Sequence, residues 1–170
     1  MDLTPFIRDI PDFPKPGIIF KDITPLLHAP QAFRYVTDTL VERYRDRGLT
    51  GIVAVESRGF MFAAPVAYKL GLPLIPARKP GKLPYKTIAE TYDLEYGSAT
   101  LEVHEDALKQ GDRVLLIDDL LATGGTLGAT CRLIERLGGE VAEVATIIEL
   151  EFLNGRDKLC GLPFFTMLKY

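Results

Sequence analysis

The chain has 170 residues, which is enough for one domain that buries a sizeable core. Its composition, 47% hydrophobic and 25% charged, is close to the globular average and excludes disordered, collagen-like and coiled-coil chains. A net charge of −3 argues against general binding to nucleic acids or anionic membranes, although a local basic loop could still hold a phosphorylated substrate.

Cysteine usage and hydropathy predict the location of the protein. The two cysteines, Cys131 and Cys160, are too few for a disulfide framework or a zinc site, so we expect buried or inert thiols. No apolar run approaches the roughly 20 residues of a membrane span, and the first residues do not resemble a signal peptide. We therefore expect a cytoplasmic protein with no membrane partner.

Helical and strand patterns alternate along the chain. Residues 9–27 contain four prolines and are expected to form an irregular layer packed on a sheet. The patterns that follow predict, in chain order, a helix over 33–44, a strand over 51–55, a helix over 60–70, strands over 74–77 and 114–117, a helix over 127–137 and a strand over 144–148. Between the strands, residues 78–97 form a long Lys-, Pro- and Gly-containing connection, which predicts a mobile flap with a short hairpin.

This alternation indicates a fold class. Short strands that are apolar on both faces are typical of a parallel sheet covered by helices. We predict an α/β protein with an open, mostly parallel sheet and helices on both faces, in a single domain over residues 1–170. Ligands of such folds bind at the carboxyl ends of the strands.

The strongest functional signal follows the predicted strand 114–117. Asp118 and Asp119 end this strand, and a glycine turn then leads into a helix. Backbone amides of such a turn, together with the positive end of the helix dipole, can bind a phosphate dianion. The turn consists of Ala122, Thr123, Gly124, Gly125 and Thr126.

An ordinary capped turn is the alternative interpretation, with Thr126 as the N-cap and both carboxylates in solvent. The paired carboxylates argue against it, because they would repel a bound phosphate unless they faced ribose hydroxyls or a magnesium ion. The segment therefore indicates a sugar phosphate site.

This segment resembles the phosphoribosyl-pyrophosphate-binding motif of type I phosphoribosyltransferases. Within that family the chain is similar to the adenine-specific enzymes over nearly its whole length. The resemblance is carried by five ordered motifs, which are residues 13–25, 56–60, 78–84 and 94–97 and the acidic and glycine segment 114–126. It implies the type I fold with an N-terminal hood (residues 1–27) and a mobile flap (residues 78–97). It also implies transfer of phosphoribose from 5-phosphoribosyl 1-pyrophosphate to adenine, giving AMP and pyrophosphate with Mg²⁺, usually in a homodimer.

The resemblance also implies roles for individual residues. The 5′-phosphate is expected at residues 122–126 and the ribose at Asp118 and Asp119, with magnesium held through the substrate and no certain protein ligand. Pyrophosphate is expected at Ser57, Arg58, Lys79 and Lys82, and adenine at Ile19, Phe20, Lys21 and Leu150. Catalysis is expected to involve Glu95, Arg58 and Lys82, with Glu95 as a general acid or hydrogen-bond partner of the purine.

Taken singly, several of these residues have ordinary explanations. Glu56 and Arg58 could form a surface ion pair, the flap cations could be solvated, Glu95 could be an exposed strand residue, and Leu150 could belong to the core. Three other functions also share parts of the pattern. They are a phosphoribosyltransferase for hypoxanthine, guanine or xanthine, a regulator that senses phosphoribosyl pyrophosphate, and a receiver-like signalling domain phosphorylated on Asp118.

Overall fold

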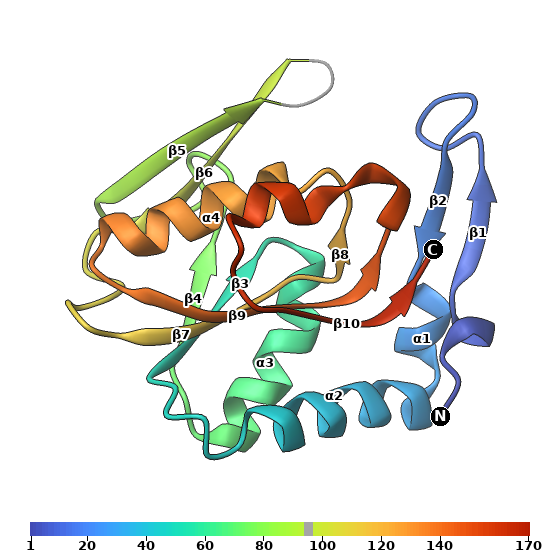
Figure 1. Ribbon diagram of the computed structural model, residues 1–170, viewed down its shortest axis with the longest axis horizontal. Helices are drawn as coiled ribbons and strands as arrows, with labels where there is room; N and C mark the ends of the chain where they lie inside the picture. The colour runs from blue at the N-terminus through green and yellow to red at the C-terminus, as the bar shows by residue number, and fades with distance from the viewer. Residues whose placement is uncertain (94–96) are drawn as a thin grey trace. The chain divides into compact units, whose positions relative to one another are not determined.

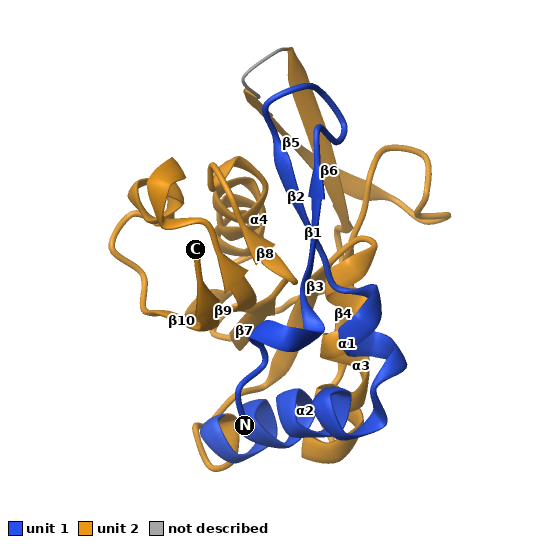
Figure 2. Cartoon of the chain, turned by 90° about the vertical axis from the view of Figure 1, so that its right-hand side faces the viewer, with its two compact units in different colours: residues 1–43 blue, residues 44–170 orange. Residues whose placement is uncertain are grey.

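The computed structural model describes residues 1–93 and 97–170 (Figure 1). Two compact units divide the chain, Met1–Arg43 and Tyr44–Tyr170, and Figure 2 colours them separately. None of the helices in the described ranges is long and apolar enough to cross a membrane.

The first unit contains a hairpin and two helices. Strands β1 (Arg8–Pro11) and β2 (Ile19–Asp22) pair antiparallel, and helices α1 (Thr24–His28) and α2 (Pro30–Tyr44) follow, after a 3₁₀ turn at Thr4–Phe6. The prediction of an irregular layer over residues 9–27 was therefore wrong. The prolines stand where strands tolerate them: Pro11 ends β1, while Pro14 and Pro16 occupy the connecting loop.

The second unit is built on a parallel sheet. Among its described residues, six strands join this sheet, which runs in the order β10-β9-β7-β3-β4 with β8 paired to β9. These strands are β3 (Gly51–Val55), β4 (Leu74–Ala77), β7 (Arg113–Ile117), β8 (Leu120–Leu121), β9 (Glu140–Glu149) and β10 (Phe164–Lys169).

The connections leave the sheet centre in opposite directions. From β3 the chain passes through α3 (Arg58–Leu70) to β4, whereas from β7 it passes through α4 (Gly125–Arg136) to β9. Because such crossovers are right-handed, the two helices cover opposite faces of the sheet (Figure 1). The strand order therefore reverses between β3 and β7, and a crevice forms at their carboxyl ends.

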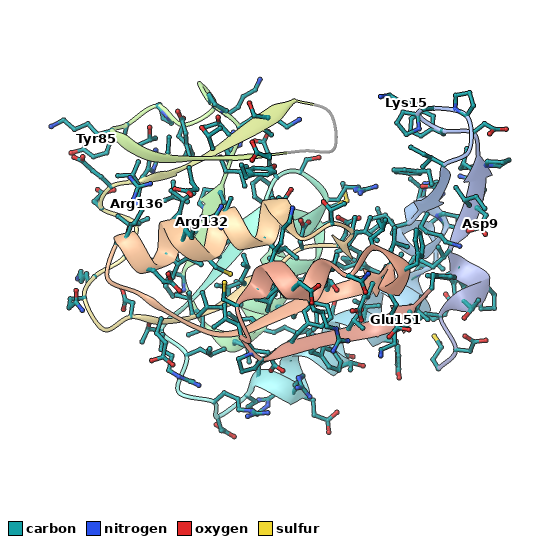
Figure 3. All side chains as sticks on the ribbon, turned by 45° about the horizontal axis from the view of Figure 1, so that its top comes forward. Asp9, Lys15, Tyr85, Arg132, Arg136 and Glu151 are labelled. Atoms are coloured by element: carbon teal, nitrogen blue, oxygen red, sulfur yellow. The ribbon has the colours of Figure 1, made fainter. Side chains whose placement is uncertain are left out.

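A long antiparallel hairpin packs on α4. It consists of β5 (Thr87–Asp93) and β6 (Ser98–His104), and Glu90 on β5 accepts hydrogen bonds from Arg132 Nε at 2.6 Å and Arg136 Nη1 at 3.1 Å. Both arginines lie on the side of α4 that faces the hairpin (Figure 3). The middle of β5 is thereby attached to the helix that follows the glycine turn.

Most of the predicted elements are confirmed. Strands β3 and β4 have the predicted bounds, and β9 is longer than predicted because its polar first residues, from Glu140, pair with the edge of β7. Burial raises the pKa of the Cys131 thiol to about 12, whereas Cys160 is exposed, so the expectation of burial holds for Cys131 alone.

A 3₁₀ segment, Gly155–Leu159, packs closely against α4. A Cβ atom at Gly128, in the second turn of that helix, would lie 2.8 Å from the carbonyl oxygen of Lys158. We therefore expect Gly128→Ala to destabilise the protein by about 1 to 3 kcal/mol, although the same change at an open helical position would stabilise it.

Chemical denaturation measures this effect. The control is Glu135→Ala, at an exposed position of α4, which should change the free energy of unfolding by less than about 0.5 kcal/mol. A Gly128→Ala variant more stable than the wild type would show that this contact does not constrain the helix.

Candidate active site

The candidate site lies where β3 and β7 end side by side. In this parallel pair Ala54 is opposite Ile117, so the residues after each strand emerge together at one edge of the sheet. They line a pocket of about 370 Å³. Its lining comprises residues 55–58, Lys79 and residues 118–127.

The glycine turn forms one wall of this pocket. Gly124 adopts a left-handed conformation with φ +78° and is the N-cap of α4, with no side-chain cap. The interpretation of Thr126 as the N-cap was therefore wrong. A Cβ atom at Gly124 would overlap the carbonyl oxygen of Gly155, so only glycine fits here. The first amides of α4 have no intrahelical acceptor, which leaves them available to an anion.

The two carboxylates of the pocket are buried. Asp118 is 8% exposed and Asp119 is 3% exposed, and the amide of Asp119 donates to Asp118 Oδ1 at 2.8 Å. Arg58 Nε lies 2.9 Å from Asp119 Oδ2 as an ion pair. Within the described part of the chain, Asp119 Oδ2 has no hydrogen-bond donor in suitable alignment. This buried oxygen is therefore balanced by the charge of Arg58 rather than by an aligned hydrogen bond.

Burial controls the titration of this pair. Loss of solvent and the neighbouring charge of Asp119 raise the pKa of Asp118 well above its ordinary value. Burial also raises the pKa of Asp119, although the charge of Arg58 acts in the opposite direction. In the free protein, the loss of solvent around these ionised carboxylates therefore costs free energy. Such an arrangement is typical of groups that serve binding rather than stability.

Helix α3 begins directly against these carboxylates. A Cβ atom at Gly59 would lie 2.9 Å from the carbonyl oxygen of Ile117 and 3.0 Å from Asp118 Oδ1. Glycine at this position lets the first turn of α3 approach the end of β7. That approach brings Arg58 within reach of Asp119.

The basic residues are divided between the pocket and its surroundings. Lys79 lines the pocket, whereas Lys82 is absent from its lining. The alternative of an ion pair between Glu56 and Arg58 was wrong, because Glu56 Oε2 accepts from Arg78 Nε at 2.7 Å. Arg78 therefore fixes the start of the flap next to the pocket, and Arg58 faces Asp119 instead.

The residues expected to bind adenine lie in both units. In the first unit, Ile19 is exposed, Phe20 makes an edge contact with the ring of Phe13, and Lys21 pairs with Asp9 at 2.7 Å. In the second unit, Leu150 is buried after β9. Glu95 lies outside the described residues.

Sequence reasoning missed two residues that adjoin the glycine turn. Tyr92 Oη lies 3.0 Å from Thr126 Oγ1, and Gly155 packs beneath the turn. The alternation of residues 87–93 could have predicted Tyr92 on the same hairpin face as Glu90. Nothing near Gly155 in the sequence indicates a contact with a turn some 30 residues earlier.

A family model for the phosphoribosyl transferase domain matches residues 22–160. The chain belongs to this family. It is 59% identical to the adenine phosphoribosyltransferase of Roseiflexus castenholzii, over 100% of this chain and 99% of the relative. The crystal structure of the Thermoanaerobacter pseudethanolicus enzyme of the same name superposes with a TM-score of 0.95 at 49% identity, covering 99% of this chain and 98% of that one. The chain therefore has the type I phosphoribosyltransferase fold.

A more distant structure shows ligands. The adenine phosphoribosyl transferase of Trypanosoma brucei, in complex with AMP, pyrophosphate and ribose-5-phosphate, has a TM-score of 0.90 at 28% identity. The match covers 97% of this chain and 77% of that one.

We expect Asp118→Asn to stabilise the free protein at neutral pH by on the order of 1 kcal/mol. Because the folded-state pKa of Asp118 is raised, its ionisation opposes folding once the pH exceeds the ordinary value of 3.8. Below that value the carboxyl is protonated in both the folded and unfolded states. The gain should therefore vanish as the pH falls from 8 to about 4 in thermal melts.

A carboxylate with the opposite shift provides the control. Asp112 accepts the amide hydrogen of Lys109 at 2.7 Å, and this bond lowers its pKa. Asp112→Asn should therefore lose stability at neutral pH and approach the wild type in acid. An Asp118→Asn variant that is less stable at every pH would instead make this carboxylate a structural cap.

Proposed function

We propose a role for each part of the pocket in the reaction of this enzyme. The reaction is the transfer of phosphoribose from 5-phosphoribosyl 1-pyrophosphate to adenine, which forms AMP and pyrophosphate in purine salvage. The observation that carries the proposal is the buried pair Asp118 and Asp119 beside an open helix N-terminus. That combination suits a ligand with both hydroxyl donors and a phosphate.

The glycine turn binds the 5′-phosphate in this proposal. Amides at the start of α4 and the hydroxyls of Thr123 and Thr126 donate to the phosphate oxygens, and the helix dipole favours its charge. Residues 122–126 all line the pocket. Asp118 and Asp119 accept hydrogen bonds from the ribose hydroxyls, which offset the cost of burying the two carboxylates.

Positive charge opposite this turn binds the pyrophosphate. Ser57, Arg58 and Lys79 line the pocket, and Arg58 offers a guanidinium that can form paired contacts to phosphate oxygens. Lys82 belongs to the same loop, since its amide donates to the carbonyl oxygen of Lys79 at 3.3 Å. We propose that Lys82 joins the pyrophosphate when its part of the flap (residues 78–97) closes over it.

Magnesium enters with the substrate in this proposal. In the described ranges no group of three or more His, Cys, Asp and Glu side chains is arranged to hold a metal ion. Carboxylate oxygens are nevertheless ligands that Mg²⁺ accepts, and Asp118 and Asp119 both line the pocket. When bound, Mg²⁺ would supply positive charge to the departing pyrophosphate.

The chemistry requires positioning and charge rather than a covalent nucleophile. As the pyrophosphate leaves, positive charge develops at the anomeric carbon, and the adenine imidazole nitrogen attacks it. Arg58 stabilises the negative charge on the leaving group, while the turn and the carboxylates hold the sugar in place. The purine loses one proton as its imidazole nitrogen bonds to the anomeric carbon, and Glu95 takes part in this proton transfer or forms a hydrogen bond with the base.

Adenine recognition is assigned to the hood (residues 1–27) and Leu150. The ring of Phe20 offers a stacking surface, and main-chain groups of Ile19 can form hydrogen bonds with the edge of the base. Lys21 Nζ is held 2.7 Å from Asp9 Oδ1, so its charge is fixed within the hairpin. Leu150 supplies a further apolar contact in this proposal.

A homodimer and a cytoplasmic location complete the proposal. Met61 and Tyr68, seven residues apart on one face of α3, are 42% and 88% exposed, and Leu74 is 37% exposed. We propose that a second copy of the chain covers this apolar face. The exposed thiol of Cys160 supports a reducing compartment.

One assay tests the proposed specificity. The protein is incubated with phosphoribosyl pyrophosphate, magnesium and adenine, hypoxanthine, guanine or xanthine in separate reactions, and nucleotide formation is measured. We expect AMP from adenine and at least about a hundredfold less product from each other base, because a hydrogen-bonding site rejects a base with mismatched donors. Comparable turnover of hypoxanthine or guanine would overturn the assignment to adenine, and no product from any base would favour the regulator.

A further inference from the structure

The hairpin touches the glycine turn through Tyr92. This residue lies on β5, and its hydroxyl shares a partly buried hydrogen bond of 3.0 Å with Thr126 Oγ1. The ring also packs against the turn, since a Cβ atom at Gly125 would lie 2.9 Å from Tyr92 Cδ2. Tyr92 therefore contacts two consecutive residues of the pocket wall.

The chemistry of the ligand sets the direction of this hydrogen bond. A hydroxyl group has one hydrogen to donate and can also accept, whereas a phosphate dianion only accepts. If Thr126 gives its hydrogen to a phosphate, its oxygen is left to accept from Tyr92. The two hydroxyls then form a chain of donors that points into the pocket, and each bond polarises the next.

The surroundings hold both hydroxyls in place. Thr130 Oγ1 donates to the carbonyl oxygen of Thr126 at 2.9 Å, which fixes the first turn of α4. On the hairpin, Arg136 Nη1 donates to the carbonyl oxygen of Ala89 at 2.7 Å and to Glu90 at 3.1 Å. Because these bonds attach the hairpin to the same helix that carries Thr126, they support the contact between the two hydroxyls.

We propose that Tyr92 is a positioning residue for the 5′-phosphate. Its hydroxyl orients the Thr126 hydroxyl toward the phosphate. This inference rests on the proposed function, in which the turn holds that phosphate.

Tyr92→Phe tests the role of the hydroxyl alone, because phenylalanine keeps the ring against Gly125. We expect the KM for phosphoribosyl pyrophosphate and the Kd for ribose 5-phosphate, measured by calorimetry, to rise about threefold to tenfold. The KM for adenine, the kcat and the melting temperature should stay at the wild-type values. If Tyr92 had only a structural role, Tyr92→Phe would lower the melting temperature and would not affect the two substrates differently.

Thr91→Val provides a matched control in the same strand. Thr91 Oγ1 shares a hydrogen bond of 2.9 Å with Thr100 on β6, so the variant also removes one hydroxyl contact from the hairpin. It does not alter the contact with Thr126. We expect an unchanged Kd for ribose 5-phosphate in this variant, and a loss equal to that of Tyr92→Phe would overturn the proposal.

A double-mutant cycle with Thr126→Val tests separately whether Thr126 binds the phosphate and whether Tyr92 orients Thr126. We expect Thr126→Val to weaken ribose 5-phosphate binding, and Tyr92→Phe to add nothing when Thr126 is already valine. If Thr126→Val binds like the wild type, the assignment of the phosphate to this hydroxyl fails and the role of Tyr92 fails with it. Suppose instead that Thr126→Val weakens binding. The role of Tyr92 alone is then overturned if Tyr92→Phe does not weaken binding, or if it weakens binding equally in the wild type and in the Thr126→Val variant.

Discussion

Burial of Asp118 and Asp119 at the carboxyl end of β7 is the constraint on which the site depends. Two adjacent carboxylates are costly in this environment, and the structure offsets the cost only in part, through Arg58 and backbone amides. Arg58 can reach Asp119 because Gly59 allows α3 to begin against β7. The geometry of the pocket thus follows from one close approach between a helix and a strand.

The glycine turn is supported from beneath as well as from the hairpin. Gly155 lies directly under Gly124, and the 3₁₀ segment that contains it is anchored where Arg156 forms two hydrogen bonds, of 2.5 and 2.6 Å, with Glu149. The guanidinium of Arg156 also lies 4.7 Å from the ring centroid of Phe164. These contacts connect the end of β9 and the start of β10 to the pocket wall, so the turn has little freedom before a ligand arrives.

Much of the fold could be predicted from the sequence. Strands β3 and β7 are short and apolar on both faces, and the acidic pair marks the end of β7 without ambiguity. The local pattern of β10 was weaker, because its residues are only partly buried. The hairpin over residues 8–22 was hidden by prolines that stand at a strand end and in the loop.

The partners of the site residues could not be predicted in the same way. Glu56 pairs with Arg78 rather than with its near neighbour Arg58, because β3 and β4 lie side by side and their ends meet. Contacts such as Tyr92 with Thr126, or Gly155 with Gly124, depend on packing between segments distant in sequence. Periodicity reports which face of an element is buried, but not which residue covers it.

We propose that the buried carboxylates are kept to bind the ribose. Hydroxyl donors favour the ionised form of a carboxyl, so a bound ribose should lower the raised pKa of Asp118 and release protons. Calorimetry of ribose 5-phosphate binding in buffers of different ionisation enthalpy, between pH 5 and 8, measures this release. We expect the wild type to release more protons than Asp118→Asn, which carries the same phosphate contacts. Equal release by the two proteins would contradict the account.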